Sequence, residues 1–281
     1  MLTPKGTQVL TNATNDDEII LSWLSGKAKT TKVSYYSTAK QFREFIGKPL
    51  SDVMIEDLNL WCDRLKMTYK PVTVQDKILI IKSLYSYCFS VGYLQNNIMA
   101  LIKTPKVKDD LAQRILDERE VKLLINATSN HRDKVILALM YGCGLRVSEV
   151  SELTWGDLKN GKLTVYGKGN KTRTVIVPES VIMMLLNLKP HPKLPYMFTS
   201  RSQTRLSRVS IFKMVKKCAE MSGLSDKISP HFLRHSHASH SLKNGANVRL
   251  VQASLGHSSV TTTERYLHID PDECSSQFIN L

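Results

Sequence analysis

The sequence predicts a mainly α-helical protein with two domains. The first is an N-terminal helical bundle, and the second is a mixed α/β domain that is mostly helical and contains a small antiparallel sheet. Three observations carry this prediction. Apolar residues recur at helical spacing through the first third of the chain. A polar, charged segment with a proline follows at residues 103–114, and beyond it a single pair of alternating segments flanks a glycine-rich turn.

The first third of the chain contains four segments with helical periodicity. We expect helices over residues 16–24, 31–46, 55–65 and 73–91. Asp16 or Asp17 is the expected cap of the first helix. In the second, Tyr35, Ala39 and Phe42 fall on one face. Aromatic stripes of this kind usually belong to a core, so the four helices predict a small bundle.

Residues 103–114 have the composition of an interdomain connection, because they are polar, charged and interrupted by Pro105. We therefore expect a helical domain over residues 1–105, a linker at 106–114 and a second domain over 115–281. A flexible linker would let the two domains close around a duplex like a clamp.

The second domain is expected to be helical apart from one hairpin. The predicted helices cover residues 117–125, 133–143, 181–188, 208–221 and 230–244. Lys162–Tyr166 and Thr172–Val177 alternate in the manner of strands around a turn at residues 167–171.

The charge of the chain favours a polyanionic partner. Its 281 residues carry a net charge of +14, and the excess is spread along the sequence. Residues 1–108 hold 15 basic and 9 acidic side chains, and residues 109–281 hold 24 and 16. Two basic halves suit double-stranded DNA held from two sides, although charge alone is also compatible with a basic protein that binds no nucleic acid.

The sequence gives no sign of a membrane span, a secretion signal or a zinc site. Its apolar runs are shorter than the roughly 20 residues that a spanning helix needs. Its first residues lack the apolar core of a signal peptide. Five scattered cysteines without a CxxC pair indicate reduced, buried thiols. We therefore expect a cytoplasmic protein.

Arg146 and Glu149 stand where a glycine-rich break separates two predicted helices. An arginine at the start of a helix offers an anion a two-pronged donor, supported by the positive end of the helix. Glu149 follows one turn later and is placed to orient a neighbouring catalytic side chain. Taken alone, the pair is equally well explained as a surface ion pair.

Lys168 lies between two glycines in the predicted hairpin turn. The glycines would hold it on a narrow finger, from which it could enter a DNA groove and give a proton to a departing oxygen. In isolation, a solvated turn lysine is the simpler interpretation. The spacing of a nucleotide-binding P-loop is absent.

His231 and Arg234 are three residues apart on a helix predicted to begin near Pro230, so they share a face. His231 and His235 share a face too, which raises the question of zinc. A zinc protease would need a glutamate where this chain has Phe232, so no metal site is expected. An arginine and a histidine near a helix start better suit a phosphate.

His257 and Tyr266 lie in the segment LGHSSVTTTERY. The glycine predicts a turn that places His257 just before a helix carrying Tyr266. Separately, neither residue is informative, because a lone tyrosine is usually part of a core or a surface.

Together, these segments resemble the tyrosine recombinase (phage integrase) family. The matching positions are Arg146, Lys168, His231, Arg234, His257 and Tyr266. The strings GLRVSE, GKGNKTR, PHFLRHSHA and LGHSSVTTTERY look most like Xer-type members. The resemblance spans residues 115–270, and it is weaker over 15–105, which is similar to the SAM-like core-binding domain of the family. Leu267 and His237 depart from the pattern without touching a matched position.

The resemblance implies a site-specific recombinase that acts in DNA integration, excision or resolution. Tyr266 would attack a phosphate, become bonded to the 3′ end and release a 5′ hydroxyl. Arg146 and Arg234 would hold the non-bridging oxygens, and His257 would add a donor.

The resemblance also assigns the proton transfers. His231 is the implied base for the tyrosine proton, and Lys168 is the implied acid for the leaving oxygen. Glu149 would act indirectly, by orienting a neighbouring catalytic side chain. No metal ion or ATP is implied, because cationic side chains supply the positive charge and the phosphotyrosine conserves the energy of the broken bond.

The implied partners are double-stranded DNA and further copies of the chain, as a homotetramer on paired sites, with accessory DNA-binding proteins as a possibility. The acidic tail at 270–281 suits docking on a neighbouring protomer, or else it is a frayed terminus. Two alternatives stay open: a type IB topoisomerase, which reseals the same strand, and a catalytically silent DNA-binding regulator. The six retained side chains argue against the second.

Overall fold

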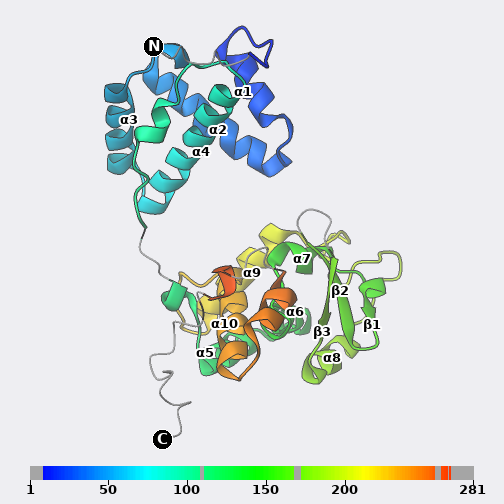
Figure 1. Ribbon diagram of the computed structural model, residues 1–281. Helices are drawn as coiled ribbons and strands as arrows, with labels where there is room; N and C mark the ends of the chain where they lie inside the picture. Colours follow the sequence, from blue (N-terminus) through cyan, green and yellow to red (C-terminus); the bar gives the residue numbers. More distant parts are fainter. Residues whose placement is uncertain (1–8, 108–110, 168–171, 257–260, 265, 267–281) are drawn as a thin grey trace, which may run out of the picture. The chain divides into compact units, whose positions relative to one another are not determined.

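The computed structural model describes residues 9–107, 111–167, 172–256, 261–264 and 266 (Figure 1). The chain divides into two compact units, residues 1–108 and 109–281. Each unit has a buried hydrophobic core of its own. The predicted class is confirmed, because the described residues are mainly helical with a small antiparallel sheet.

The first unit is a helical bundle. Its elements are α1 (Asp16–Ser25), α2 (Lys29–Ile46), η1 (Leu50–Asp52), α3 (Ile55–Thr68), α4 (Pro71–Ser90) and η2 (Ile98–Leu101). The four predicted α-helices are confirmed. Pro71 occupies the first turn of α4, and Gly47 ends α2 with a φ of 69°. The ring of Phe42 meets Trp61 and Tyr85 edge-on in the core, with centroids 4.9 and 6.1 Å away.

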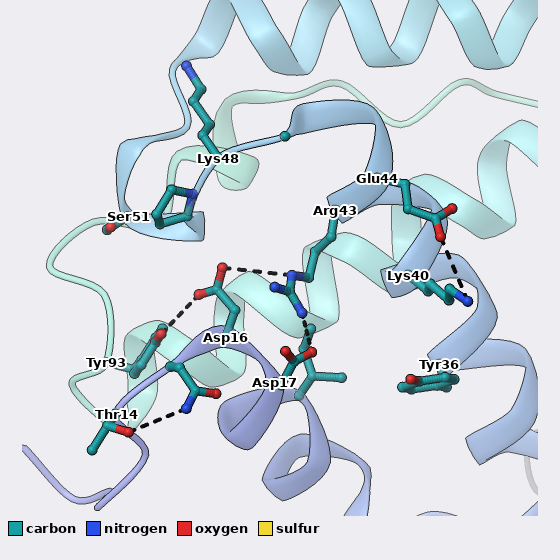
Figure 2. Close-up of a pocket in the computed structure, with 14 residues that line it drawn as sticks. Thr14, Asp16, Asp17, Tyr36, Lys40, Arg43, Glu44, Lys48, Ser51 and Tyr93 are labelled. Carbon is teal, nitrogen blue, oxygen red and sulfur yellow. Dashed lines mark hydrogen bonds and ion pairs between the residues drawn. The ribbon is translucent and has the colours of Figure 1, made fainter.

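The start of α1 differs from its prediction. Its cap is Asn15 rather than Asp16 or Asp17. Asp16 is instead buried, and its carboxylate accepts a hydrogen bond from the Tyr93 hydroxyl (Figure 2) and another from the Leu50 backbone N–H. This carboxylate therefore fastens distant backbone to the first helix.

The second unit packs around α6 (Figure 1). Its helices are η3 (Leu111–Arg114), α5 (Glu118–Asn126), α6 (His131–Gly142), α7 (Val147–Glu152), η4 (Trp155–Asp157), α8 (Glu179–Leu186), α9 (Arg208–Met221), α10 (Pro230–Lys243), α11 (Val248–Leu255) and α12 (Thr261–Glu264). All six residues from Val135 to Met140 are buried, as expected for a helix surrounded by others. Helix α11 was not predicted from the sequence.

The sheet of the second unit has the order β1-β2-β3 and is antiparallel throughout. Its strands are β1 (Leu158–Lys159), β2 (Lys162–Tyr166) and β3 (Thr172–Ile176). The predicted hairpin is confirmed, whereas β1 was not foreseen. Leu163, Val165 and Val175 are buried, so one face of the hairpin packs on the core. The hairpin tip at 168–171 lies outside the described residues.

The segment expected as a linker, 106–114, ends in η3. Leu111 is buried there in a small cluster with Ala238, Val251, Leu255 and Tyr266. The backbone N–H of the following Leu116 donates a hydrogen bond of 2.8 Å to the Ser236 hydroxyl of α10. The end of this segment therefore belongs to the packing of the second unit.

The composition also gave expectations for the cysteines and for membrane-spanning helices. Cys62, Cys88, Cys143 and Cys218 are unpaired and buried, and Cys274 lies outside the described residues. Among the helices of the described ranges, none is long and apolar enough to cross a bilayer.

Candidate active site

Arg146 and Glu149 form a local pair at the start of α7. Arg146 occupies the cap position, and its backbone N–H and its guanidinium both donate 2.8 Å hydrogen bonds to the Glu149 carboxylate. Glu149 therefore holds this arginine in place. The Glu149 side chain accepts the cap N–H of α7, so that backbone group is already paired.

Arg173 on β3 joins this pair and was missed by the sequence reasoning. Its guanidinium makes a two-pronged contact with Glu149, at 2.8 and 2.9 Å. Its Nε–H also donates to the Ser254 carbonyl at 2.6 Å. A usable signal was present, because Arg173 is two residues from Val175 and therefore lies on the buried face of the strand. A cation on that face needs an acidic partner.

Glu149 is the charged centre of this arrangement and is only 5% exposed. Burial alone would raise the pKa of its carboxyl group. Hydrogen bonds from Arg173 and Arg146, together with the charge of Arg173, outweigh burial and lower that pKa below its ordinary value. Glu149 is therefore ionised at neutral pH and holds two guanidiniums.

Arg234 lies on α10 and is 5% exposed. It donates 2.6 Å hydrogen bonds to the carbonyls of Gly144 and Leu255. Burial, followed by the charge of Arg146, lowers the pKa of Arg234 to about 9, so it stays cationic at neutral pH. Gly144 has a φ of 60°, and a Cβ there would lie 2.7 Å from the His237 ring and from Leu255. The glycine therefore lets the loop before Arg146 approach Arg234.

Three successive carbonyls at the C-terminal end of α11 accept hydrogen bonds from three different arginines. The carbonyls of Ser254, Leu255 and Gly256 receive, in that order, Arg173 at 2.6 Å, Arg234 at 2.6 Å and Arg146 at 3.4 Å. The last carbonyls of a helix lack partners within the helix and carry its negative pole, so cations are favoured there. Segments that are far apart in the sequence meet at this helix end.

His231 lies in the first turn of α10 and is exposed. It lines a pocket of about 340 Å³ together with Gln113, Arg114, Lys227, Ser229 and Phe232. Partial desolvation, and then the charges of Arg234, Arg146 and Arg114, lower the pKa of His231. Its imidazole is therefore neutral at pH 7 in a cationic surrounding.

Helix α10 also carries the two histidines, His231 and His235, that raised the possibility of a zinc site. The rings of His231 and His235 have centroids 6.3 Å apart. Within the described ranges, histidine, cysteine and acidic side chains do not gather in groups of three or more that could hold a metal ion.

Tyr266 lies in the small cluster with Leu111 and Leu255, and it is 6% exposed. Its hydroxyl is 2.6 Å from Nδ1 of His235, and the two ring centroids are 5.8 Å apart. Tyr266 is also close enough to Arg234 for a negative charge on its phenol to raise the pKa of that arginine. His235 was not predicted to contact the tyrosine.

The structure thus brings four of the six predicted residues into one region of the second unit: Arg146, His231, Arg234 and Tyr266. Lys168 and His257 lie outside the described residues, and their roles stay predictions. The described chain reaches close to both of them. Strands β2 and β3 enter the turn of Lys168, and Gly256, with a φ of 63°, ends α11 just before His257.

The sequence and the fold can both be compared with known proteins. The profile of the phage integrase family matches residues 114–273. A tyrosine recombinase of Pseudothermotoga lettingae is 33% identical over 254 residues, which cover 86% of this chain and 88% of that protein. The tyrosine recombinase XerD of Proteus mirabilis is 30% identical over 295 residues, covering 95% and 94%.

A solved structure with the same fold is that of a lambda integrase tetramer bound to a Holliday junction. It has a TM-score of 0.76 and 19% sequence identity, with 93% of this chain and 81% of that chain covered. The family match and the two relatives lead to one conclusion. The chain belongs to the phage integrase family and is a tyrosine recombinase of the Xer type.

Proposed function

We propose that the chain is a site-specific DNA recombinase that cleaves and rejoins strands through a 3′-phosphotyrosine intermediate on Tyr266. The surroundings of Tyr266 carry the proposal. Its ring lies in a cluster with Leu255, whose carbonyl accepts a hydrogen bond from Arg234. A phenol and a buried guanidinium therefore meet at the end of α11, as attack on a DNA phosphate requires.

The arginines supply the electrostatic part of the reaction. Arg146 and Arg173 contact the Glu149 carboxylate, and Arg234 lies within reach of its charge without contacting it, so one negative charge faces three positive charges and an excess is left for a phosphate. The Arg146 side chain is 33% exposed, against 11% for Arg173. We therefore assign Arg146 and Arg234 to the non-bridging oxygens, where preorganised donors stabilise the charge of the phosphorane. Arg173 holds Glu149 and positions Arg146 through it.

The remaining roles are assigned by family resemblance. Lys168 protonates the leaving 5′ oxygen, and His257 donates to the phosphate. The resemblance gives the phenolic proton to His231, whereas the structure has His235 in contact with that hydroxyl.

A nicked suicide duplex tests the proposal. Cleavage close to a nick releases a short fragment, which diffuses away and traps the covalent protein–DNA complex. We expect the wild-type chain to form this complex in EDTA, since the proposal assigns no step to a metal ion. Tyr266→Phe should form none while binding the duplex normally. Normal binding without any wild-type complex would indicate a DNA-binding regulator instead.

Paired target sites separate recombination from topoisomerase activity. A recombinase should produce Holliday junctions from two duplexes, whereas a type IB topoisomerase would only relax supercoils. The neighbour with the same fold is a tetramer bound to a Holliday junction, which supports a homotetramer on paired sites here. Native mass spectrometry of the complex should give four chains on two duplexes. A cytoplasmic location and the use of accessory DNA-binding proteins are further parts of the proposal.

Binding should depend steeply on salt. Both halves of the chain are basic, so counterions are released when lysines and arginines neutralise phosphates. We expect the affinity for a duplex to fall by at least about 10³-fold between 50 and 200 mM salt, measured by fluorescence anisotropy. A flat dependence would contradict a grip from both domains.

A further inference from the structure

The contact between His235 and Tyr266 joins two side chains that are each held in place. His235 lies on α10 between Arg234, whose guanidinium donates to two carbonyls, and the buried Ser236, whose hydroxyl accepts the Leu116 N–H. The helix backbone at His235 is therefore fixed on both sides. A catalytic group on a rigid element keeps its geometry better than one on a loop.

The phenol is fixed from its own side. Its ring is buried with Val251 and Leu255, and its backbone N–H donates to the Thr263 carbonyl at 3.1 Å. Oη of Tyr266 lies 2.6 Å from Nδ1 of His235, which is within the reach of a general base. The contact therefore joins the reacting oxygen to a titratable nitrogen of the same subunit.

His231 occupies a different position. It lies one turn earlier on α10, with its ring centroid 6.3 Å from that of His235. It is exposed and lines the pocket that also contains Arg114 and Lys227. Those two cations make this pocket suitable for the DNA backbone, whereas His235 contacts the phenol.

From this geometry we infer that His235 is a catalytic residue that accepts the phenolic proton of Tyr266 during cleavage. The inference rests on the proposed function and reassigns one of its steps. The Oη–H bond breaks and its proton moves to Nδ1, which requires the tautomer with the other proton on Nε2. The Oη electron pair forms the bond to phosphorus. The P–O5′ bond breaks, and O5′ takes its proton from Lys168. During rejoining, the imidazolium of His235 returns its proton to Oη.

A base is needed because a phenol with a pKa near 10 is almost entirely protonated at neutral pH. The excess of arginine charge around Arg234 favours the phenolate once the proton has left. General-base catalysis typically contributes about 10²- to 10⁴-fold. Loss of His235 should slow cleavage by a factor in this range.

The test uses single-turnover formation of the covalent complex with His235→Asn and His235→Ala. The Asn oxygen can accept a hydrogen bond near the position of Nδ1, but it cannot take the proton. A base role predicts that both variants are at least about 10²-fold slow. The chain offers a matched control in His240→Asn. His240 lies on the same helix, and its Nδ1 is 2.9 Å from the hydroxyl of Tyr141. This control should cleave within about threefold of wild type, because Tyr141 is not the nucleophile.

One replacement in the nucleophile and one in the DNA substrate show which of the two proton transfers a variant has lost. Difluorotyrosine at position 266 has a more acidic phenol, so it should recover at least about tenfold of the rate in His235→Asn. A 5′-bridging phosphorothiolate needs no acid for its leaving group, so it should relieve Lys168→Ala but not His235→Asn. Duplex binding and thermal unfolding of each variant show that it is folded.

Several results would overturn the inference. One is a His235→Asn variant as fast as wild type, which would reduce His235 to a positioning residue. Another is rescue by difluorotyrosine in His231→Ala and not in His235→Asn, which would identify His231 as the base for the phenolic proton. If the wild-type chain forms no covalent complex, the proposed function fails and the inference fails with it.

Discussion

The two units of the chain each bury a carboxylate, and the two carboxylates are held in different ways. Among the described residues, Asp16 in the first unit and Glu149 in the second are the acidic side chains classed as buried. Asp16 accepts hydrogen bonds from two neutral donors, the Leu50 N–H and the Tyr93 hydroxyl, and the guanidinium of Arg43 is 3.9 Å away. Figure 2 shows Tyr93 and Arg43 beside this carboxylate.

Glu149 is held by cations instead. Arg146 and Arg173 both contact it at 2.8 Å, and both also reach the end of α11. The comparison teaches how to distinguish two kinds of buried charge. The partners of Asp16 tie backbone and core together, whereas the partners of Glu149 carry more positive charge than one carboxylate balances. The second kind marks a site prepared for an anion.

The largest expected effect follows from removing the buried cation of the second unit. Arg234→Ala should reduce cleavage by about 10²- to 10³-fold or more, because it removes a preorganised donor to the phosphorane. Duplex binding should change little, since most of the affinity comes from other phosphate contacts. Single-turnover cleavage and anisotropy measure the two effects. An equal loss of both would contradict the role assigned to Arg234.

Glu149→Gln would remove the negative charge that holds Arg146 and Arg173 in the second unit. It leaves Arg173 without its buried counter-charge, and loss of one partner of a buried pair typically costs about 3–5 kcal/mol. We expect urea unfolding of the second unit to show a loss of this size, with slower cleavage by the protein that stays folded. The double variant Glu149→Gln/Arg173→Gln should recover part of the stability. A fully additive double variant would mean that the two side chains do not depend on each other.

Acid should destabilise the second unit more than the first, because all eight histidines lie beyond residue 130. Burial lowers the pKa of His237 from about 6.5 to about 4 in the folded state. Between these values the unfolded chain binds a proton that the folded chain does not, so stability falls as the pH drops from 6.5 to 4. The loss from His237 is up to about 3 kcal/mol.

Hydrogen exchange of the two units at pH 7 and pH 5 measures this difference. Protection should fall in the second unit and change less in the first. His237→Gln should flatten the change, since glutamine does not titrate. Equal losses in both units would remove histidine as the cause.

The smallest effect is expected at Asp16. Asp16→Asn keeps the size of the side chain but weakens the hydrogen bonds from Leu50 and Tyr93, which should cost about 1–3 kcal/mol in thermal unfolding. Cleavage per folded molecule should not change, because this carboxylate serves the fold of the first unit. A loss of cleavage without a loss of stability would show that Asp16 supports the active site, as Glu149 does.

The sequence predicted what depends on neighbours along the chain. Helical periodicity located most helices, alternation located the hairpin, and the three-residue spacing of Arg146 and Glu149 indicated their pairing. Arg173 and His235 could not be assigned in this way. Arg173 meets its partners across 24 and 81 residues, and His235 meets Tyr266 across 31. Such contacts are fixed by the packing of α10, α11 and β3.

Helix α11 was a different kind of omission. Its signals were present in the sequence, because Asn247 caps it and Gly256 ends it. Eight residues with one apolar face are, however, easily taken for a loop between longer helices. This omission mattered, because the carbonyls at the end of α11 organise the arginines.

The row of carbonyls from Ser254 to Gly256 couples the positions of three arginines to one helix end. Guanidiniums from the hairpin, from the start of α7 and from α10 share one point of attachment, so displacing it would misplace Arg146, Arg173 and Arg234 at once. Intermediate activity from a partly assembled centre would then be rare. A strand-exchange enzyme gains safety from this, because an idle protomer leaves the DNA intact, whereas one that cuts and cannot rejoin leaves a broken strand.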